Sequence, residues 1–386
     1  MQLHNYINLD QLERHIESGL VSRQFHPHWP LAILNYTQEA MGKTHDDPVL
    51  RACRGLIYDL KTMQIIARPM KAFFNYNDNR YFETVPGRGL PPATVYHEVT
   101  EKMDGSLGIV YQYQDNPPEI ATRGSFVSEQ AKWATEYLHQ NCTAKFTLPQ
   151  GMTLLCEIIY PENRIVVDYQ GTKGLVLLAM IYNETGLELT WDEMDWSIRL
   201  HDLNPPFTLI RYYPAKRTAQ CAEENERNRE GYVAKYFVAY KHEPIRVKIK
   251  FEDYKLAHKA MFGMHNRDVW ELLKNGKEID LENFRICPQG FIEWLTQQVN
   301  AFQIRFKCIE TQVWDALAII KWYKPSPDRK TVAEFFKTRA VQAKIPWLTG
   351  VLFAAYDKKN YQAVIWKGLR PERAIGYVAA KLEEPC

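Results

Sequence analysis

The pattern of hydrophobic residues changes near Tyr254, and this change divides the chain into two kinds of structure. Before it, short runs rich in β-branched and aromatic residues alternate with turn signals, which is typical of strands. Two helices are also expected there, at residues 9–20 and 128–140. We therefore expect an α+β domain over residues 1–254 and an all-helical domain over residues 255–386.

In the second half of the chain, apolar residues recur at spacings of three and four from Ile292 to Ile320. Such spacing predicts one long amphipathic helix. Prolines at positions 325 and 327 end it, and further helices are expected at residues 331–343 and 348–356.

The composition is compatible with an intracellular enzyme. The 386 residues are 46% hydrophobic, and 48 basic residues nearly balance 46 acidic ones, so binding to any polyanion would need a local basic groove. Seven scattered cysteines without a paired C-x-x-C favour reduced thiols over a structural zinc site. The longest apolar run, residues 175–182, is too short to cross a bilayer, so we expect a cytoplasmic protein without a membrane partner.

Lys102 lies in the segment Glu101-Lys102-Met103-Asp104-Gly105-Ser106, which joins an amine to a turn-forming dipeptide. Strand-like runs precede and follow this segment. Burial at a strand end can lower the pKa of a lysine from about 10.4 and give a neutral amine that attacks a phosphate. An exposed lysine beside a hairpin turn fits the same segment equally well.

Two carboxylates and one basic stripe occupy strand-like runs further along the chain. Glu157 interrupts an apolar run, where a buried carboxylate needs a cation or hydrogen-bond donors. Glu230 stands directly before a glycine that allows close backbone approach to a ligand. Arg246, Lys248 and Lys250 alternate with apolar residues and share one strand face, which is typical of a solvated edge or of an anion site.

In this order the segments resemble the RNA ligase 1 family typified by a phage enzyme, and the resemblance runs through most of the chain. It rests first on the K-x-D-G-S pattern that begins at Lys102. The other matching segments are Cys53-Arg54-Gly55, Arg68-Pro69-Met70, Phe73-Phe74-Asn75, Arg123-Gly124-Ser125, Ser128-Glu129-Gln130-Ala131, Glu157, Pro161-Glu162-Asn163-Arg164-Ile165-Val166, Glu230-Gly231-Tyr232-Val233-Ala234, Lys248-Ile249-Lys250, Tyr254 and Asp328-Arg329-Lys330-Thr331.

The resemblance implies a nucleotidyltransferase domain of the ATP-grasp-like ligase kind with antiparallel sheets. It implies that Lys102 attacks the α-phosphate of ATP, so that lysyl-AMP forms and pyrophosphate leaves. By the same resemblance, Lys248 and Lys250 meet the α-phosphate and Arg54 meets the triphosphate. Further nucleotide contacts are implied at Glu101, Arg123, Glu157 and Glu230, and the last two are expected beside Mg²⁺ or Mn²⁺.

Two positions depart from the family pattern. The family commonly has lysine directly before Phe-Phe-Asn, whereas this chain has Ala72 there and Lys71 one place earlier. A shift by one residue on a strand would point the ammonium to the opposite face, which puts its phosphate role in doubt. Arg123 stands where the family has lysine, and arginine can still bind phosphate with bidentate geometry.

The implied activity is ATP-dependent sealing of a 3′-hydroxyl and a 5′-phosphate RNA end through an RNA-adenylate, in RNA repair or in repair of a nicked tRNA, by a monomer. Two alternatives remain open: a non-catalytic nucleotide-binding or RNA-binding module, and a GTP-dependent capping guanylyltransferase. Capping enzymes and DNA ligases generally follow the last basic motif with OB-fold strands, which residues 255–386 do not resemble. A P-loop kinase is excluded because Thr37 occupies the position of its first glycine.

Overall fold

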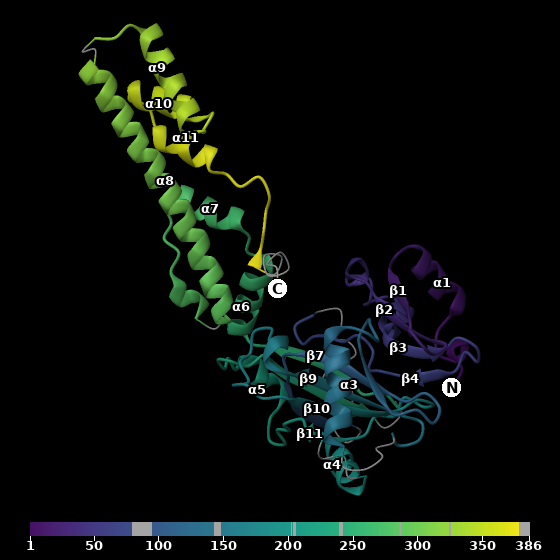
Figure 1. The fold of residues 1–386 in the computed structure, drawn as a ribbon. Coiled ribbons are helices and arrows are strands. Elements are labelled where there is room, and N and C mark those ends of the chain that lie inside the picture. The colour runs from purple at the N-terminus through teal and green to yellow at the C-terminus, as the bar shows by residue number, and fades with distance from the viewer. Residues whose placement is uncertain are drawn as a thin grey trace. The chain divides into compact units, whose positions relative to one another are not determined.

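The computed structural model describes residues 1–78, 95–142, 148–201, 203, 206–238, 242–285, 287–323 and 326–377. Its contacts divide the chain into two compact units, Met1–Lys255 and Leu256–Cys386. Figure 1 shows that sheets make up most of the first unit, while the second consists of helices.

The N-terminal part of the first unit is a four-stranded antiparallel sheet. Its order is β1-β2-β3-β4, with β1 at Val21–Phe25, β2 at Leu31–Tyr36, β3 at Arg54–Asp59 and β4 at Ile65–Ala67. Two helices, α1 (Leu9–Glu17) and α2 (Pro48–Ala52), begin at side-chain caps that satisfy free backbone N–H groups. Asn8 caps the first, and Asp47 caps the second.

A five-stranded sheet forms the middle of the unit, in the order β11-β10-β9-β7-β8. Its strands are β7 (Ser106–Tyr111), β8 (Glu119–Thr122), β9 (Met152–Ile159), β10 (Gly174–Tyr182) and β11 (Phe207–Leu209), and only β11 pairs in parallel. Helix α3 (Glu129–Asn141) covers one face through Ala134 and Leu138 (Figure 1). The opposite face packs Ile109 and Leu155 against Ile33 and Ile57 of the N-terminal sheet. The middle sheet is therefore buried on both faces.

A third sheet completes the unit in the order β5-β13-β12-β6. It contains β5 (Phe74–Asn75), β6 (Val95–Lys102), β12 (Gly231–Val238) and β13 (Ile245–Lys250). The longest pairings, of β12 with β6 and with β13, are antiparallel. The short helix α4 (Trp191–Leu200) connects β10 to β11 within the second sheet, and α5 (Thr218–Glu223) lies in the connection from the second sheet to the third. Short 3-10 turns occur at Leu3–Asn5, Gln38–Ala40, Pro161–Asn163 and Leu281–Phe284.

The second unit is helical over the residues that the structure describes. It contains α7 (Asn266–Lys274), α8 (Gln289–Tyr323), α9 (Arg329–Gln342), α10 (Leu348–Tyr356) and α11 (Tyr361–Gly368), and α6 (Glu252–Gly263) crosses the boundary between the units. The long helix α8 buries the apolar stripe that its spacing predicted, including Leu295, Phe302, Ile309 and Val313. No helix among the described residues has the length and apolar character needed to span a membrane.

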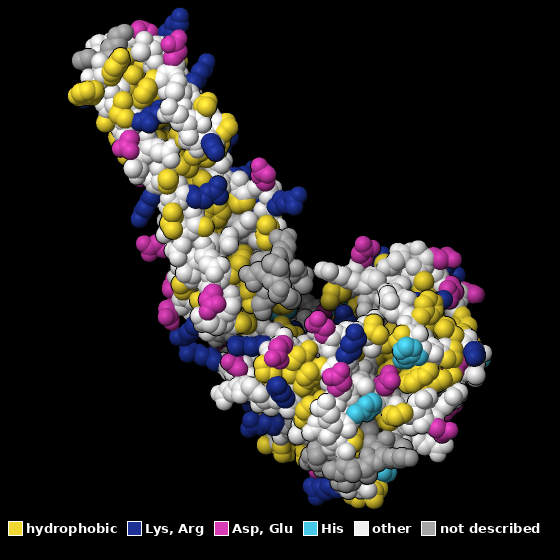
Figure 2. Space-filling model, in the orientation of Figure 1, with side chains coloured by type: hydrophobic (Ala, Val, Ile, Leu, Met, Phe, Trp, Pro, Cys, Tyr) yellow, Lys and Arg dark blue, Asp and Glu magenta, His cyan; other side chains and the backbone are white. Residues whose placement is uncertain are grey.

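The expected fold class is confirmed: antiparallel and mixed sheets with helices are followed by a helical C-terminal region. Both predicted N-terminal helices and all three predicted C-terminal helices are present. The sequence did not predict the remaining helices, which are short and lack a long apolar repeat: α2, α4, α5, α6, α7 and α11. On the face shown in Figure 2, acidic and basic side chains are interspersed, in agreement with the formal net charge of +2.

Candidate active site

The face of the third sheet carries three rows of paired residues. One row joins Lys102, Gly231 and Lys250, and a second joins Thr100, Val233 and Lys248. A third joins Glu98, Lys235 and Arg246. Because side chains alternate between faces along a strand, residues two apart on β6, β12 and β13 share one face.

The basic stripe of β13 is therefore not a solvated edge. β13 lies between β5 and β12, and Arg246 is buried. β12 pairs with both β13 and β6, so the stripe shares one face of the sheet with Lys102 at the end of β6. The alternative of an exposed lysine beside a hairpin is also wrong, because only 21% of the Lys102 side chain is exposed.

Glu230 connects the two lysines of the first row. Its Oε2 lies 2.9 Å from Lys102 Nζ, and its Oε1 lies 2.8 Å from Lys250 Nζ. Gly231 permits this arrangement: its φ is +145°, and a Cβ there would stand 1.9 Å from the carbonyl oxygen of Ile249. A side chain at this position would collide with β13. The sequence suggested that this glycine allows a ligand to approach the backbone, whereas in the structure it allows β13 to approach.

The pKa of Lys102 is raised, although burial acts to lower it. The negative charges of Glu230, Glu157 and Asp104 raise the pKa and outweigh the cost of burial. The expectation that burial alone produces a neutral amine is therefore wrong for this arrangement. The amine must lose its proton before it can act as a nucleophile.

Asp104 fixes the turn that follows Lys102. Its Oδ2 accepts hydrogen bonds from the N–H groups of Val166 and Val167, each at 2.8 Å. Its Oδ1 accepts one from the Tyr254 hydroxyl at 2.7 Å, and its own N–H donates to the Tyr169 hydroxyl at 2.7 Å. This buried carboxylate is thus a structural anchor for the lysine segment.

Glu157 lies on β9 beside the same turn. Its Oε1 accepts a hydrogen bond from Gly105 N–H at 3.0 Å. Desolvation raises the pKa of this carboxyl to about 7, and Lys102 opposes that effect. A carboxylate in such a place gains from any additional cation that approaches it.

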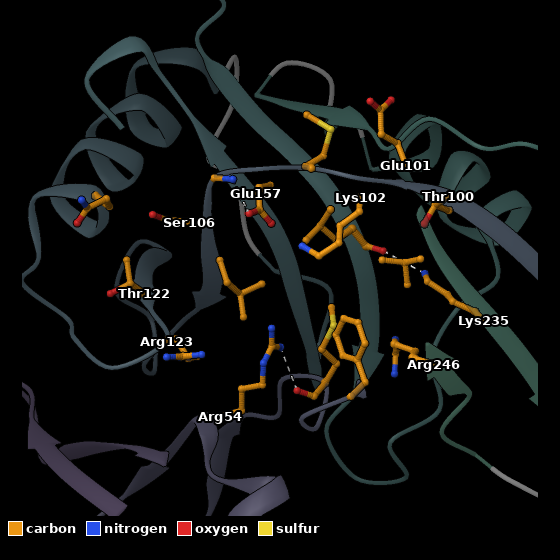
Figure 3. A pocket seen from close by; sticks show the side chains of 18 of the residues that line it. Arg54, Thr100, Glu101, Lys102, Ser106, Thr122, Arg123, Glu157, Lys235 and Arg246 are labelled. Carbon is orange, nitrogen blue, oxygen red and sulfur yellow. Dashed lines mark hydrogen bonds between the residues drawn. The ribbon is translucent and has the colours of Figure 1, made fainter. Parts of the chain in front are cut away.

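A cavity of about 540 Å³ opens beside Lys102 and is lined by residues of all three sheets (Figure 3). It contains five of the predicted site residues: Arg54, Glu101, Lys102, Arg123 and Glu157. Its other described lining residues are Asn35, Met70, Phe73, Thr100, Met103, Gly105, Ser106, Leu107, Thr122, Gly124, Gln130, Leu178, Val233, Lys235 and Arg246.

The predicted site residues do not all face this cavity. In Figure 3 the Glu101 carboxylate points away from it, and Glu101 Oε1 lies 3.2 Å from Arg229 Nε on the other side of the sheet. The described lining does not include Glu230, Lys248 or Lys250. Both lysines instead line another cavity, of about 280 Å³.

Lys248 nevertheless lies close to the main cavity through Phe73. Lys248 Nζ lies 5.7 Å from the centre of the Phe73 ring, and the Arg54 guanidinium lies 5.6 Å from that ring. Desolvation, together with the positive charges of Lys250, Lys102 and Arg54, lowers the pKa of Lys248 to about 8. This concentration of positive charge favours an anionic ligand.

Arg123 lies on the opposite wall of the main cavity, with its guanidinium 5.2 Å from the Tyr36 ring. Lys71 does not line the main cavity: its Nζ is 2.8 Å from Glu243, and it lines a cavity of about 380 Å³ that shares Phe73 and Arg246 with the main one. Ala72 is buried. Lys71 therefore does not take the place of the lysine that the family pattern has at position 72.

Lys235 is a cavity residue that the sequence did not single out. Its Nζ lies 3.0 Å from Glu188 and 3.2 Å from the carbonyl oxygen of Leu178, and desolvation lowers its pKa to about 8. Arg246 pairs with the same Glu188. The only sequence signal for Lys235 was its period-two spacing from Gly231 on β12.

The carboxylates offer a divalent cation few protein ligands. Among the described residues, no three His, Cys, Asp or Glu side chains form a group that could hold a metal ion. Glu157 fits as a single carboxylate ligand beside substrate phosphates, which is the usual manner of Mg²⁺ binding. Glu230 fits poorly, because an ammonium group occupies each of its oxygens.

Comparisons with known proteins agree on one family. Residues 52–256 match the family model for phage-type RNA ligases. A putative RNA ligase of Thermovibrio ammonificans is 28% identical over 246 residues, which is 62% of each chain. A putative bifunctional polynucleotide kinase/RNA ligase of Autographa californica nuclear polyhedrosis virus is 30% identical over 175 residues, or 40% of this chain and 24% of the relative.

Among solved structures, an RNA ligase variant of Naegleria gruberi with AMP and Mn is 19% identical. The alignment covers 42% of this chain and 52% of that one, with a TM-score of 0.33. This chain thus spans less than two thirds of each of these three proteins. The family match extends over more than half of this chain and includes the lysine turn, both strand carboxylates and the β13 stripe. The chain belongs to the phage-type RNA ligase family.

Proposed function

We propose that this protein is an ATP-dependent RNA ligase that joins a 3′-hydroxyl end to a 5′-phosphate end. The observation that carries the proposal is the row of Lys102, Gly231 and Lys250, which sets an amine beside a cavity and next to a second ammonium. Family membership adds the class of substrate, RNA. We expect the protein to act as a cytoplasmic monomer in RNA repair, with a nicked tRNA as one candidate substrate.

In the first step, the lone pair of Lys102 Nζ attacks the α-phosphorus of ATP. A nitrogen–phosphorus bond forms, the bond to the β-phosphate oxygen breaks, and pyrophosphate leaves with the electron pair. The proton of the ammonium must depart first, and Glu230 Oε2 is the nearest base, at 2.9 Å. Charge that develops on the phosphate oxygens is stabilised by Lys248, Lys250 and Arg54.

In the second step, an oxygen of the RNA 5′-phosphate attacks the same phosphorus, and the bond to Lys102 breaks. This forms an RNA-adenylate and returns the amine to its starting state. In the third step, the 3′-hydroxyl of the other end attacks the 5′-phosphate, and AMP leaves. The same preorganised cations serve all three transfers, because each develops negative charge on non-bridging oxygens.

A divalent cation, Mg²⁺ or Mn²⁺, would be held by Glu157 and the substrate phosphates, and it would supply further positive charge at the phosphate. Arg123 and Arg54 stand on cavity walls where they can meet phosphate groups. The Glu101 carboxylate has no such role, because it points to the other face of the sheet. We assign Glu230 to the two lysines in place of the metal contact expected from the resemblance.

The alternatives receive less support. A module without catalysis would not need an amine, a carboxylate base and two further lysines in one sheet region, all of which are present. A capping guanylyltransferase would bring OB-fold strands, and the described part of the second unit has none. The test is incubation with each nucleoside triphosphate, labelled in its α-phosphate, and Mg²⁺, followed by denaturing electrophoresis. We expect ATP to label the protein, and labelling by GTP alone would support the capping alternative.

A further inference from the structure

A second ion pair lies on the reverse face of the sheet, directly behind the pair of Lys102 and Glu230. Arg229 Nε lies 3.2 Å from Glu101 Oε1. Glu101 precedes Lys102 in the chain, and Arg229 precedes Glu230. Two ion pairs thus join the same two chain segments. On the front face the cation, Lys102, belongs to the β6 segment, and on the reverse face the cation, Arg229, belongs to the segment before β12.

The alternation of side chains along a strand explains this double connection. Lys102 and Glu101 are the last two residues of β6, so their side chains leave on opposite faces. β6 pairs Lys102 with Gly231 and Glu101 with Tyr232. Arg229 and Glu230, the two residues directly before β12, therefore each pair with a charged residue at the end of β6, one on each face of the sheet.

Arg229 is held firmly in its place. Its Nη2 donates to the Tyr213 hydroxyl at 2.6 Å, and its Nη1 donates to Glu226 and, at 3.4 Å, to the Tyr232 hydroxyl. Only 15% of its side chain is exposed, and 17% of the Glu101 side chain is exposed. An ion pair screened from solvent in this way is geometrically defined, unlike a mobile surface pair.

The backbones on either side are also fixed. The N–H of Glu101 donates to the carbonyl oxygen of Arg211, and the carbonyl oxygen of Glu230 accepts from the N–H of Phe251, both at 2.9 Å. The charged contact between Arg229 and Glu101 thus joins two segments that are each anchored elsewhere. A displacement at either segment would change the distance between Lys102 and Glu230.

We propose that Arg229 is a positioning residue for the nucleophile: its ion pair with Glu101 holds the ends of β6 and β12 so that Lys102 meets Glu230. The inference rests on the proposed function, in which Lys102 attacks ATP. A shift of about 1 Å in a reacting group can cost roughly a hundredfold in rate, so a fixed back-face contact matters for the chemical step. Arg229 itself touches neither the cavity nor the nucleotide in this proposal.

The competing explanation is that Arg229 only stabilises the fold. Lys216 provides a matched control, because its Nζ lies 2.7 Å from the same Tyr232 hydroxyl and 2.6 Å from Glu224. It belongs to the same back-face cluster of charges and tyrosines and contacts Glu224 and Tyr232, whereas Glu101 pairs with Arg229. Loss of Lys216 should therefore weaken packing without displacing Lys102.

The test is single-turnover labelling of the full chain by α-phosphate-labelled ATP, over a range of ATP concentrations. We expect Arg229→Gln and Glu101→Gln each to lower the maximal rate about tenfold, with the half-saturating ATP concentration unchanged within about twofold. The double variant should be no slower than either single one, because both remove the same contact. Arg229→Lys should recover most of the rate, and Lys216→Gln should keep the full rate.

Additive losses in the double variant, near a hundredfold, would overturn the proposal, as would an equal loss in Lys216→Gln. So would a change confined to the half-saturating ATP concentration. If Arg229→Gln does not fold, the nearly isosteric Glu101→Gln and the conservative Arg229→Lys still decide the question. Failure of the unaltered protein to label at Lys102 would overturn the proposed function itself. Normal labelling in every variant would overturn only the positioning role of Arg229.

Discussion

Lys102 and Glu230 form an ion pair of 2.9 Å across two paired strands, although 127 residues separate them in the chain. The residue that lets their strands approach is Gly231, which lies between Lys102 and Lys250 in the sheet. The reactive geometry therefore depends on backbone packing as much as on the charged groups themselves. This dependence makes the glycine a direct point of test.

Gly231→Ala should lower the rate of lysine adenylylation at least about tenfold and lower stability by about 1–3 kcal/mol. The new Cβ would stand 1.9 Å from the Ile249 carbonyl oxygen, at a φ of +145° that side chains rarely adopt. Labelling rate and thermal unfolding check this. Gly42→Ala is the control, because an added Cβ there meets nothing within 4 Å. Normal rate and stability in Gly231→Ala would mean that the strands tolerate separation at this point.

Tyr254→Phe should lower the free energy of unfolding by about 1–2 kcal/mol, because the Asp104 carboxylate loses one of its donors. Denaturant titration with a probe in the first unit measures this. Tyr137→Phe removes a hydroxyl whose hydrogen bond, 3.4 Å long, is exposed, and it should change stability much less. Equal effects of the two substitutions would show that Asp104 does not depend on Tyr254.

The affinity for ATP should fall as the pH rises through about 8. Burial and neighbouring cations lower the pKa of Lys248 to about 8, so its positive charge is present below that pH and lost above it. Loss of one phosphate contact corresponds to up to about tenfold in affinity. Lys248→Arg should flatten this dependence, because a guanidinium stays charged throughout the range. An identical pH profile in Lys248→Arg would assign the titration to another group.

Removal of the residues after Gly263, where α6 ends, should leave lysine adenylylation intact and reduce sealing of a structured RNA. The matched ligase segments before Lys255 contain every residue assigned to ATP, whereas a folded RNA is held over a longer surface through its phosphates and shape. Comparison of labelling with sealing of a nicked anticodon loop and of an unstructured strand measures this. Unchanged sealing of both RNAs by a folded truncation would exclude a role in substrate choice, and aggregation would show that the helices cover an apolar face.

The sequence predicted the elements of the site better than their connections. Enrichment in β-branched and aromatic residues located β6, and period-two alternation located β13 and put Lys248 and Lys250 on one face. It could not show that β12 lies between these strands, because pairing between distant segments depends on tertiary packing. The contact of Glu230 with both lysines follows from that pairing, as does the raised pKa of Lys102.

Other contacts of the site could not be predicted from the sequence. The orientation of Glu101 toward Arg229 could have been inferred from strand alternation, but the identity of its partner could not. Lys235 is buried with Glu188, and no local pattern joins a β12 lysine to a glutamate between β10 and α4. A resemblance to a family carries motif residues, whereas such supporting contacts arise only when the chain is folded.

The most direct test of the central claim is covalent labelling of the unaltered chain by α-phosphate-labelled ATP and Mg²⁺, followed by peptide mapping of the labelled residue. We predict that AMP becomes attached to Lys102, that Lys102→Ala carries no label, and that the exposed Lys173→Ala labels normally. Addition of RNA with a 5′-phosphate should then release the label from the protein. Full labelling of Lys102→Ala, or a label mapped to another residue, would contradict the assignment of Lys102 as the nucleophile.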